Sequence, residues 1–173
     1  MSLINNPRKA VIGVGIFVLL FVLGLMFNRC HGAELGPTDA PYVQFSGGST
    51  MIRGPAPVID LAFTTPASQL RNAYWQGSMT LIGSSSNRGI DAPNNVAVRG
   101  LFVDGLGRFD FGLGLSWMMN PYPYNGSNVN FALQADYRFK KLPLTITWAH
   151  LSNAGMTDHN LGRDMLMLGW RFH

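Results

Sequence analysis

Residues 108–118 read RFDFGLGLSWM, a stretch in which large apolar side chains occupy every second position. The odd-numbered positions from 109 carry Phe, Phe, Leu, Leu and Trp, and the positions between them carry Asp, Gly, Gly and Ser. Successive side chains of a β-strand point to opposite faces, so a period of two indicates a strand with two unlike faces. The stretch therefore predicts a strand with one apolar face and one small or polar face.

The same alternation recurs along the rest of the chain. It is strong in the segments 129–139, 144–149 and 165–172, and weaker candidates are Pro41–Met51, Pro57–Thr65, Asn72–Gly83 and Asn94–Asp104. Together these make eight strands, and a tilted strand of about ten residues is long enough to cross a bilayer. The sequence predicts an all-β fold: an eight-stranded antiparallel transmembrane β-barrel of the bacterial outer membrane.

The composition favours a membrane barrel over a soluble one. Only 13% of the 173 residues are charged, against 47% hydrophobic, and soluble domains carry about 25% charged residues. A soluble lipocalin-like barrel would turn the apolar parity inward and the other parity outward. That outer parity would hold few charges besides Asp110, Asp136, Arg138 and Arg171, which is too few for a soluble surface.

The net charge of +4 gives no sign of a nucleic-acid partner, because Arg8, Lys9 and Arg29 account for most of it. The remaining basic and acidic residues nearly balance, and no basic cluster is left to neutralise a row of phosphates. Cys30 is the only cysteine, which excludes an internal disulfide and a cysteine-based metal site.

The N-terminal segment is typical of an export signal. Ala10–Phe27 is an unbroken run of eighteen apolar or Gly residues that follows a basic pair. Small residues at Gly32 and Ala33 offer a cleavage site, so residues 1–33 are predicted to be a signal peptide and 34–173 the barrel. An uncleaved anchor is the alternative. Lipidation of Cys30 is disfavoured, because the three residues before it are not small.

The connections between the predicted strands fall into two classes. Those at 104–107 and 139–143 are short, whereas 84–93, 120–128 and 153–163 are long and polar. Outer-membrane barrels have short periplasmic turns and longer extracellular loops. The long connections are therefore expected on the extracellular side.

Beside the last long loop, three polar side chains occupy positions in the otherwise apolar series that is predicted to face lipid. On the penultimate strand this series continues to His150 and Ser152, and on the last strand it leads back to Asp164. Because the two strands are antiparallel neighbours, the three residues are expected to cluster on the outer wall, at the depth of the outer leaflet. Polar groups facing lipid cost free energy, and Ser, His and an acid are the components of a hydrolytic triad. Interfacial polar residues at a strand end remain the other interpretation.

Residues 150–155, HLSNAG, resemble the motif of the outer-membrane lipid A 3-O-deacylases, the PagL family. The resemblance covers the last two predicted strands. It implies an esterase that removes the 3-hydroxyacyl chain at position 3 of lipid A through a membrane-facing Ser-His-Glu triad. Carried over, it makes Ser152 the nucleophile, His150 the general base and Asp164 the acid. The family's Glu is here the shorter Asp, which leaves Asp158 as an alternative acid.

The resemblance also implies oxyanion donors and partners. The backbone N–H of Gly155 and the side chain of Asn160 are expected to stabilise the oxyanion, with Asn153 in support. No metal or cofactor is implied. Lipid A or lipopolysaccharide is the expected substrate, and outer-membrane lipids are expected to surround the barrel. The sequence leaves open whether the chain forms a homodimer. Arg163 is a candidate for contact with a lipid phosphate. The alternative function is a non-catalytic barrel with a structural or adhesive role.

Overall fold

The structure of the chain is a computed structural model that describes residues 41–173 except 52–53, 68–69, 71, 88–89 and 156–160. The predicted signal peptide lies outside the described residues. Within the described ranges, no helix is long and apolar enough to cross a membrane.

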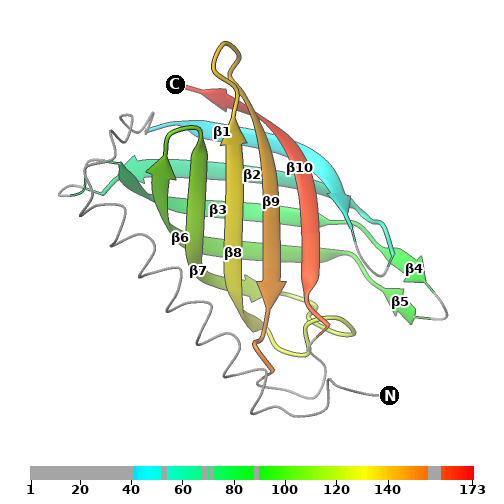
Figure 1. The fold of residues 1–173 in the computed structure, drawn as a ribbon. Helices are drawn as coiled ribbons and strands as arrows, with labels where there is room; N and C mark the ends of the chain where they lie inside the picture. The colour runs from blue at the N-terminus through cyan, green and yellow to red at the C-terminus, as the bar shows by residue number, and fades with distance from the viewer. Residues whose placement is uncertain (1–40, 52–53, 68–69, 71, 88–89, 156–160) are drawn as a thin grey trace, which may run out of the picture.

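Eight strands close into an antiparallel barrel, as the alternation predicted (Figure 1). Around the barrel the order is β1-β10-β9-β8-β7-β6-β3-β2, so that the first and last strands pair and leave no open edge. The strands are β1 (Val43–Thr50), β2 (Pro57–Pro66), β3 (Ala73–Ile82), β6 (Asn95–Leu106), β7 (Phe109–Met118), β8 (Val129–Arg138), β9 (Leu144–Ser152) and β10 (Arg163–Phe172).

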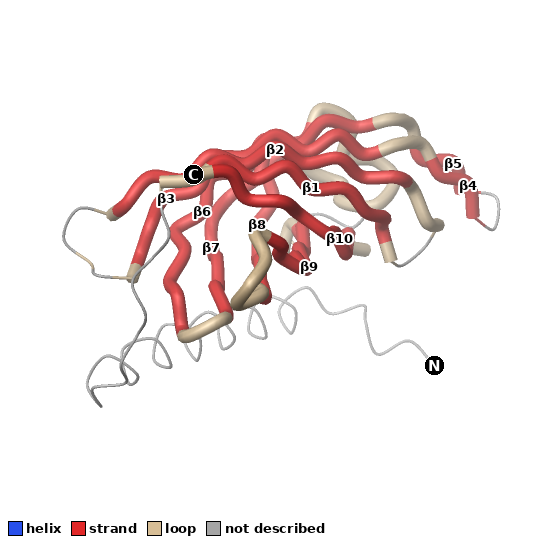
Figure 2. The backbone as a smooth tube through the Cα atoms, turned by 90° about the horizontal axis from the view of Figure 1, so that it is seen from above, coloured by secondary structure: helices blue, strands red, loops and turns tan. Residues whose placement is uncertain are grey.

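One of the predicted loops contains a small hairpin of its own. β4 (Ser85–Asn87) and β5 (Ile90–Ala92) pair only with each other, and Figure 2 shows them projecting beyond the barrel. A predicted turn is also shorter than expected. β6 continues through Asp104 and Gly105, which pair with β7, so only Gly107 and Arg108 form the connection.

The outward face of the wall is apolar, which confirms the predicted parity. On β7, for example, Phe109, Leu115 and Trp117 are about half exposed, whereas Asp110 and Ser116 are buried. The predicted lipid-facing side chains of β9 and β10 also lie on the outward face. The chain thus presents a continuous apolar surface suited to a bilayer.

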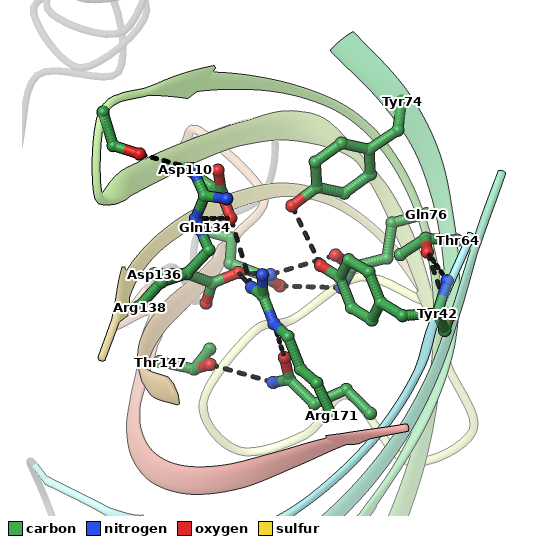
Figure 3. A network of polar contacts seen from close by, with 12 residues as sticks. Tyr42, Thr64, Tyr74, Gln76, Asp110, Gln134, Asp136, Arg138, Thr147 and Arg171 are labelled. Carbon is green, nitrogen blue, oxygen red and sulfur yellow. Dashed lines mark hydrogen bonds and ion pairs between the residues drawn. The ribbon is translucent and has the colours of Figure 1, made fainter. Parts of the chain in front are cut away.

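A cluster of charged side chains lies inside the barrel, where its members neutralise one another. Arg171 is 3.1 Å from Asp110 and 3.6 Å from Asp136, and its guanidinium lies over the ring of Tyr42. Figure 3 shows this cluster, in which the Tyr42 hydroxyl donates a hydrogen bond to the Tyr74 hydroxyl. The soluble-barrel alternative requires these charges on the outside, and their burial excludes it.

A second buried ion pair lies further along the interior. The Arg99 guanidinium is 2.8 Å from Asp60 and also donates to Gln134 Oε1 at 3.0 Å. Thr80 donates its hydroxyl hydrogen to the same Asp60 oxygen. Buried charges are tolerated where partners compensate them. The inward-facing side chains of the strands therefore fill the interior with a network of paired polar groups that links the strands.

The long connections meet at one end of the barrel. The β3–β6, β7–β8 and β9–β10 connections lie there together with the shorter β1–β2 connection, and the remaining turns and the C-terminus lie at the other end (Figure 1). The end of β9 and the start of β10 are side by side at the end with the long connections. This end carries the predicted site.

Candidate functional site

His150 and Asp164 are brought together on the outward face, as the parity predicted. They are register partners across β9 and β10. Their side chains are 28% and 19% exposed, and the outward residues on the barrel side of the pair, Trp148 and Leu166, are apolar. The two polar side chains therefore lie on the outward face of the barrel.

The imidazole of His150 contacts the carboxylate through one defined nitrogen. Nδ1 of His150 lies 3.0 Å from Oδ1 of Asp164. A carboxylate at Nδ1 selects the tautomer with the proton on that nitrogen, which leaves Nε2 as the proton acceptor. The pair has the arrangement of a base and its orienting acid.

Two further residues restrict the His150 ring. The indole of Trp148 is nearly parallel to the imidazole, with the ring centroids 6.0 Å apart. Gly162 lies against the ring edge: a Cβ added there would be 2.8 Å from Cε1. Gly162 also has a φ of 65°, which favours glycine. Period-two alternation carries no information about either contact, so sequence reasoning missed them.

Ser152 is the last residue of β9 and lies on the same face as His150, two positions further along. Its Oγ accepts a hydrogen bond from the backbone N–H of Ala154 at 3.1 Å. The chain then turns through Ala154 and Gly155, whose φ angles of 55° and 79° are both left-handed. This turn ends the strand directly after the serine.

The predicted supporting residues Asn153 and Gly155 contact each other. The Gly155 N–H donates to Asn153 Oδ1 at 2.9 Å, and Asn153 is fully buried. The N–H that the resemblance assigns to the oxyanion is thus engaged within the turn. Asn160 and the alternative acid Asp158 lie outside the described residues.

Arg163 does not lie beside Asp164 on the wall. It is inward-facing and buried, and its guanidinium lies 4.9 Å from the ring centroid of Tyr124. The expectation of a phosphate contact next to Asp164 rested on sequence adjacency, but adjacent residues of a strand face opposite sides. Arg163 instead packs against the β7–β8 connection.

Within the described part of the chain, no three His, Cys, Asp or Glu residues come together in a group that could hold a metal ion. The chemistry available at this site is that of a hydroxyl, an imidazole and a carboxylate. These groups can carry out nucleophilic attack on an acyl carbon with general acid–base catalysis.

The chain is similar to known proteins in sequence and in fold. A family model described as lipid A 3-O-deacylase (PagL) matches residues 63–173, well over half of the chain and including both strands of the site. A solved structure titled "Crystal structure of the outer membrane enzyme PagL" aligns with a TM-score of 0.52 at 19% identity, covering 76% of this chain and 99% of that one. At this identity the likeness supports the fold. No curated protein matches the chain.

Proposed function

This chain belongs to the PagL family of lipid A 3-O-deacylases, and on that premise we propose that it is a serine esterase that uses Ser152, His150 and Asp164. It is a protein of the bacterial outer membrane. The substrate is lipid A, and the bond cleaved is the ester of the 3-hydroxyacyl chain at position 3. The observation that carries the proposal is the contact of His150 with Asp164 on the outward face of the barrel.

The reaction proceeds in two acyl transfers. Nε2 of His150 takes the proton of Ser152 Oγ as this oxygen attacks the ester carbonyl carbon. The tetrahedral intermediate expels the sugar oxygen, which receives the proton from His150, and the acyl chain stays on Ser152. Water, activated by His150, then releases the 3-hydroxy fatty acid and restores the serine. Asp164 holds the ring and stabilises its protonated form.

The position of the polar residues supports a role in catalysis. A carboxylate and an imidazole in an apolar wall cost free energy of insertion, and the cost grows with depth. The interior of this barrel has an extensive polar network that could hold such groups at lower cost. Their location on the outside, where acyl chains lie, fits a substrate that approaches through the membrane.

The direct register of the two strands favours Asp164 over Asp158 as the acid. Side chains directly opposite each other in an antiparallel pair have Cβ atoms about 4.5–5.5 Å apart. An Asp can span that gap to the imidazole, and the observed 3.0 Å contact fits. The methylene missing relative to the family's Glu is therefore no obstacle to the proposed role.

We assign oxyanion stabilisation to the backbone N–H of Gly155 and the side chain of Asn160, with Asn153 in support. The Asn153 amide oxygen accepts from the Gly155 N–H, and this contact orients the turn that follows the nucleophile. When substrate binds, the oxyanion takes the place of Asn153 Oδ1 as the acceptor from Gly155. The partners proposed are lipid A or lipopolysaccharide, outer-membrane lipids and a second copy of the chain, the last testable by cross-linking in membranes.

The purified barrel in detergent micelles provides the direct test. Incubated with lipid A, it should release free 3-hydroxy fatty acid, detected by mass spectrometry, and Ser152→Ala should release none. Absence of release by a folded wild-type barrel would favour the alternative, a structural or adhesive barrel without catalysis.

A further inference from the structure

The connection between β7 and β8, residues 119–128, contacts both sides of the β9–β10 hairpin. The Tyr124 carbonyl accepts a hydrogen bond from the Leu161 N–H at 2.8 Å, on the β10 side, and the Tyr124 ring lies against Arg163. The next residue, Asn125, makes the contacts on the β9 side. Figure 1 shows this connection at the same end of the barrel as the end of β9.

Asn125 binds the residues on either side of the serine. Its side chain is fully buried, and Nδ2 donates to the Leu151 carbonyl at 2.9 Å and to Asn130 Oδ1 at 3.1 Å. Its backbone carbonyl accepts from Nδ2 of Asn153. Leu151 and Asn153 flank Ser152, so one residue of a distant connection holds the chain on both sides of the proposed nucleophile.

The chemistry of these contacts specifies an amide at position 125. The Leu151 carbonyl is only an acceptor, so the group that faces it must be a donor. The Asn125 Oδ1 is buried and has no hydrogen-bond partner among the described residues. Among the described residues, the hydrogen bonds of the Asn125 side chain are therefore all made by Nδ2. Removal of the donor would deprive the buried Leu151 carbonyl of one hydrogen bond and release the strand end from the β7–β8 connection, so that the strand end would shift.

We propose that Asn125 is a positioning residue, which holds the Ser152 backbone so that Oγ stays aligned with the His150 imidazole. This rests on the proposed function. Asn125 acts through its hydrogen bonds with Leu151 and Asn153, the two neighbours of Ser152 in the chain. Misplacement of a reacting group by about 1 Å can cost about 100-fold in rate.

The chain offers a matched control for this residue. Asn95 is also a buried asparagine that is tied to the same connection: its Oδ1 accepts from the Asn120 N–H at 3.0 Å, and its Nδ2 donates to the Asn120 carbonyl. Asn95 lies on β6, on the other side of the connection from β9. Loss of Asn95 loosens the connection without touching the residues around the serine.

The experiment compares Asn125→Ala, Asn125→Asp and Asn95→Ala in the full barrel, with folding checked by heat-dependent migration in gels. One readout is kcat and KM on lipid A, and the other is the rate at which a fluorophosphonate labels Ser152. Both Asn125 variants should lose about 10- to 100-fold in kcat and in labelling rate with KM nearly unchanged. Asn125→Asp should not rescue, because it places an oxygen opposite the Leu151 carbonyl. Asn95→Ala should stay within about twofold of wild type.

Several outcomes would overturn the positioning role. These are wild-type rates in folded Asn125→Ala, an equal loss in Asn95→Ala, or failure of both Asn125 variants to fold while Asn95→Ala folds. A wild-type barrel that is inert to lipid A and to the fluorophosphonate would instead contradict the proposed function, and the positioning role with it. Labelling that is normal in all variants overturns the positioning role alone.

Discussion

His150 of β9 and Asp164 of β10 lie directly opposite each other on the outward face of the barrel, with Nδ1 and Oδ1 3.0 Å apart. His150 precedes and Asp164 follows the long connection between β9 and β10. Their contact depends on the register of the β9–β10 pair, because a shift of one residue would send one of the two side chains into the interior.

Asp164→Asn should lower kcat by about 1,000-fold or more, since an amide no longer stabilises the imidazolium and can present its N–H to Nδ1. Asp164→Glu restores the acid of the family resemblance and should keep most of the activity. Initial rates of 3-hydroxy fatty acid release measure both. A fully active Asp164→Asn barrel would transfer the role to Asp158.

Ser152→Ala and His150→Ala should each abolish nearly all deacylation, and the double variant should be no worse than either single variant, because the residues of the proposed triad act as one unit. All three variants should still insert and fold. Replacing an outward-facing polar group by Ala removes a desolvation cost in the membrane and opens no cavity in the barrel interior. Heat-dependent gel migration reports folding separately from activity. Additive losses in the double variant would mean that the two residues work independently.

Gly162→Ala should reduce kcat by about tenfold or more, because the new Cβ would press on Cε1 of His150 and turn the ring away from its partners. Backbone strain at a left-handed φ is a separate effect, and Gly107→Ala controls for it. Gly107 has a φ of 62° with nothing within 4 Å of an added Cβ. Equal activities of the two variants would show that contact with the ring is unimportant.

Arg99→Met should destabilise the barrel by about 3–5 kcal/mol, because it leaves the buried Asp60 carboxylate without its cation. Urea unfolding in lipid vesicles measures this change. Adding Asp60→Leu to Arg99→Met should recover part of the loss, since the uncompensated charge is then gone. An unchanged unfolding midpoint in Arg99→Met would indicate that water compensates Asp60.

The strands could be predicted from sequence because period-two alternation is a local property of each segment. The β4–β5 hairpin was missed, since strands of three residues are too short to establish an alternation. His150, Ser152 and Asp164 stood out because they break the apolar parity. Asn125 could not be identified from the sequence, because its proposed role depends on how the β7–β8 connection folds against β9. Such a contact between distant segments leaves no periodic signal.

We propose that Ser152 removes one acyl chain from lipid A at the outer membrane. Mass spectrometry of lipid A from cells that express the wild-type chain or Ser152→Ala tests it most directly. We predict that lipid A from wild-type cells loses the mass of one 3-hydroxyacyl chain and that lipid A from Ser152→Ala cells keeps it. An equal loss in cells with a folded Ser152→Ala barrel would contradict the claim.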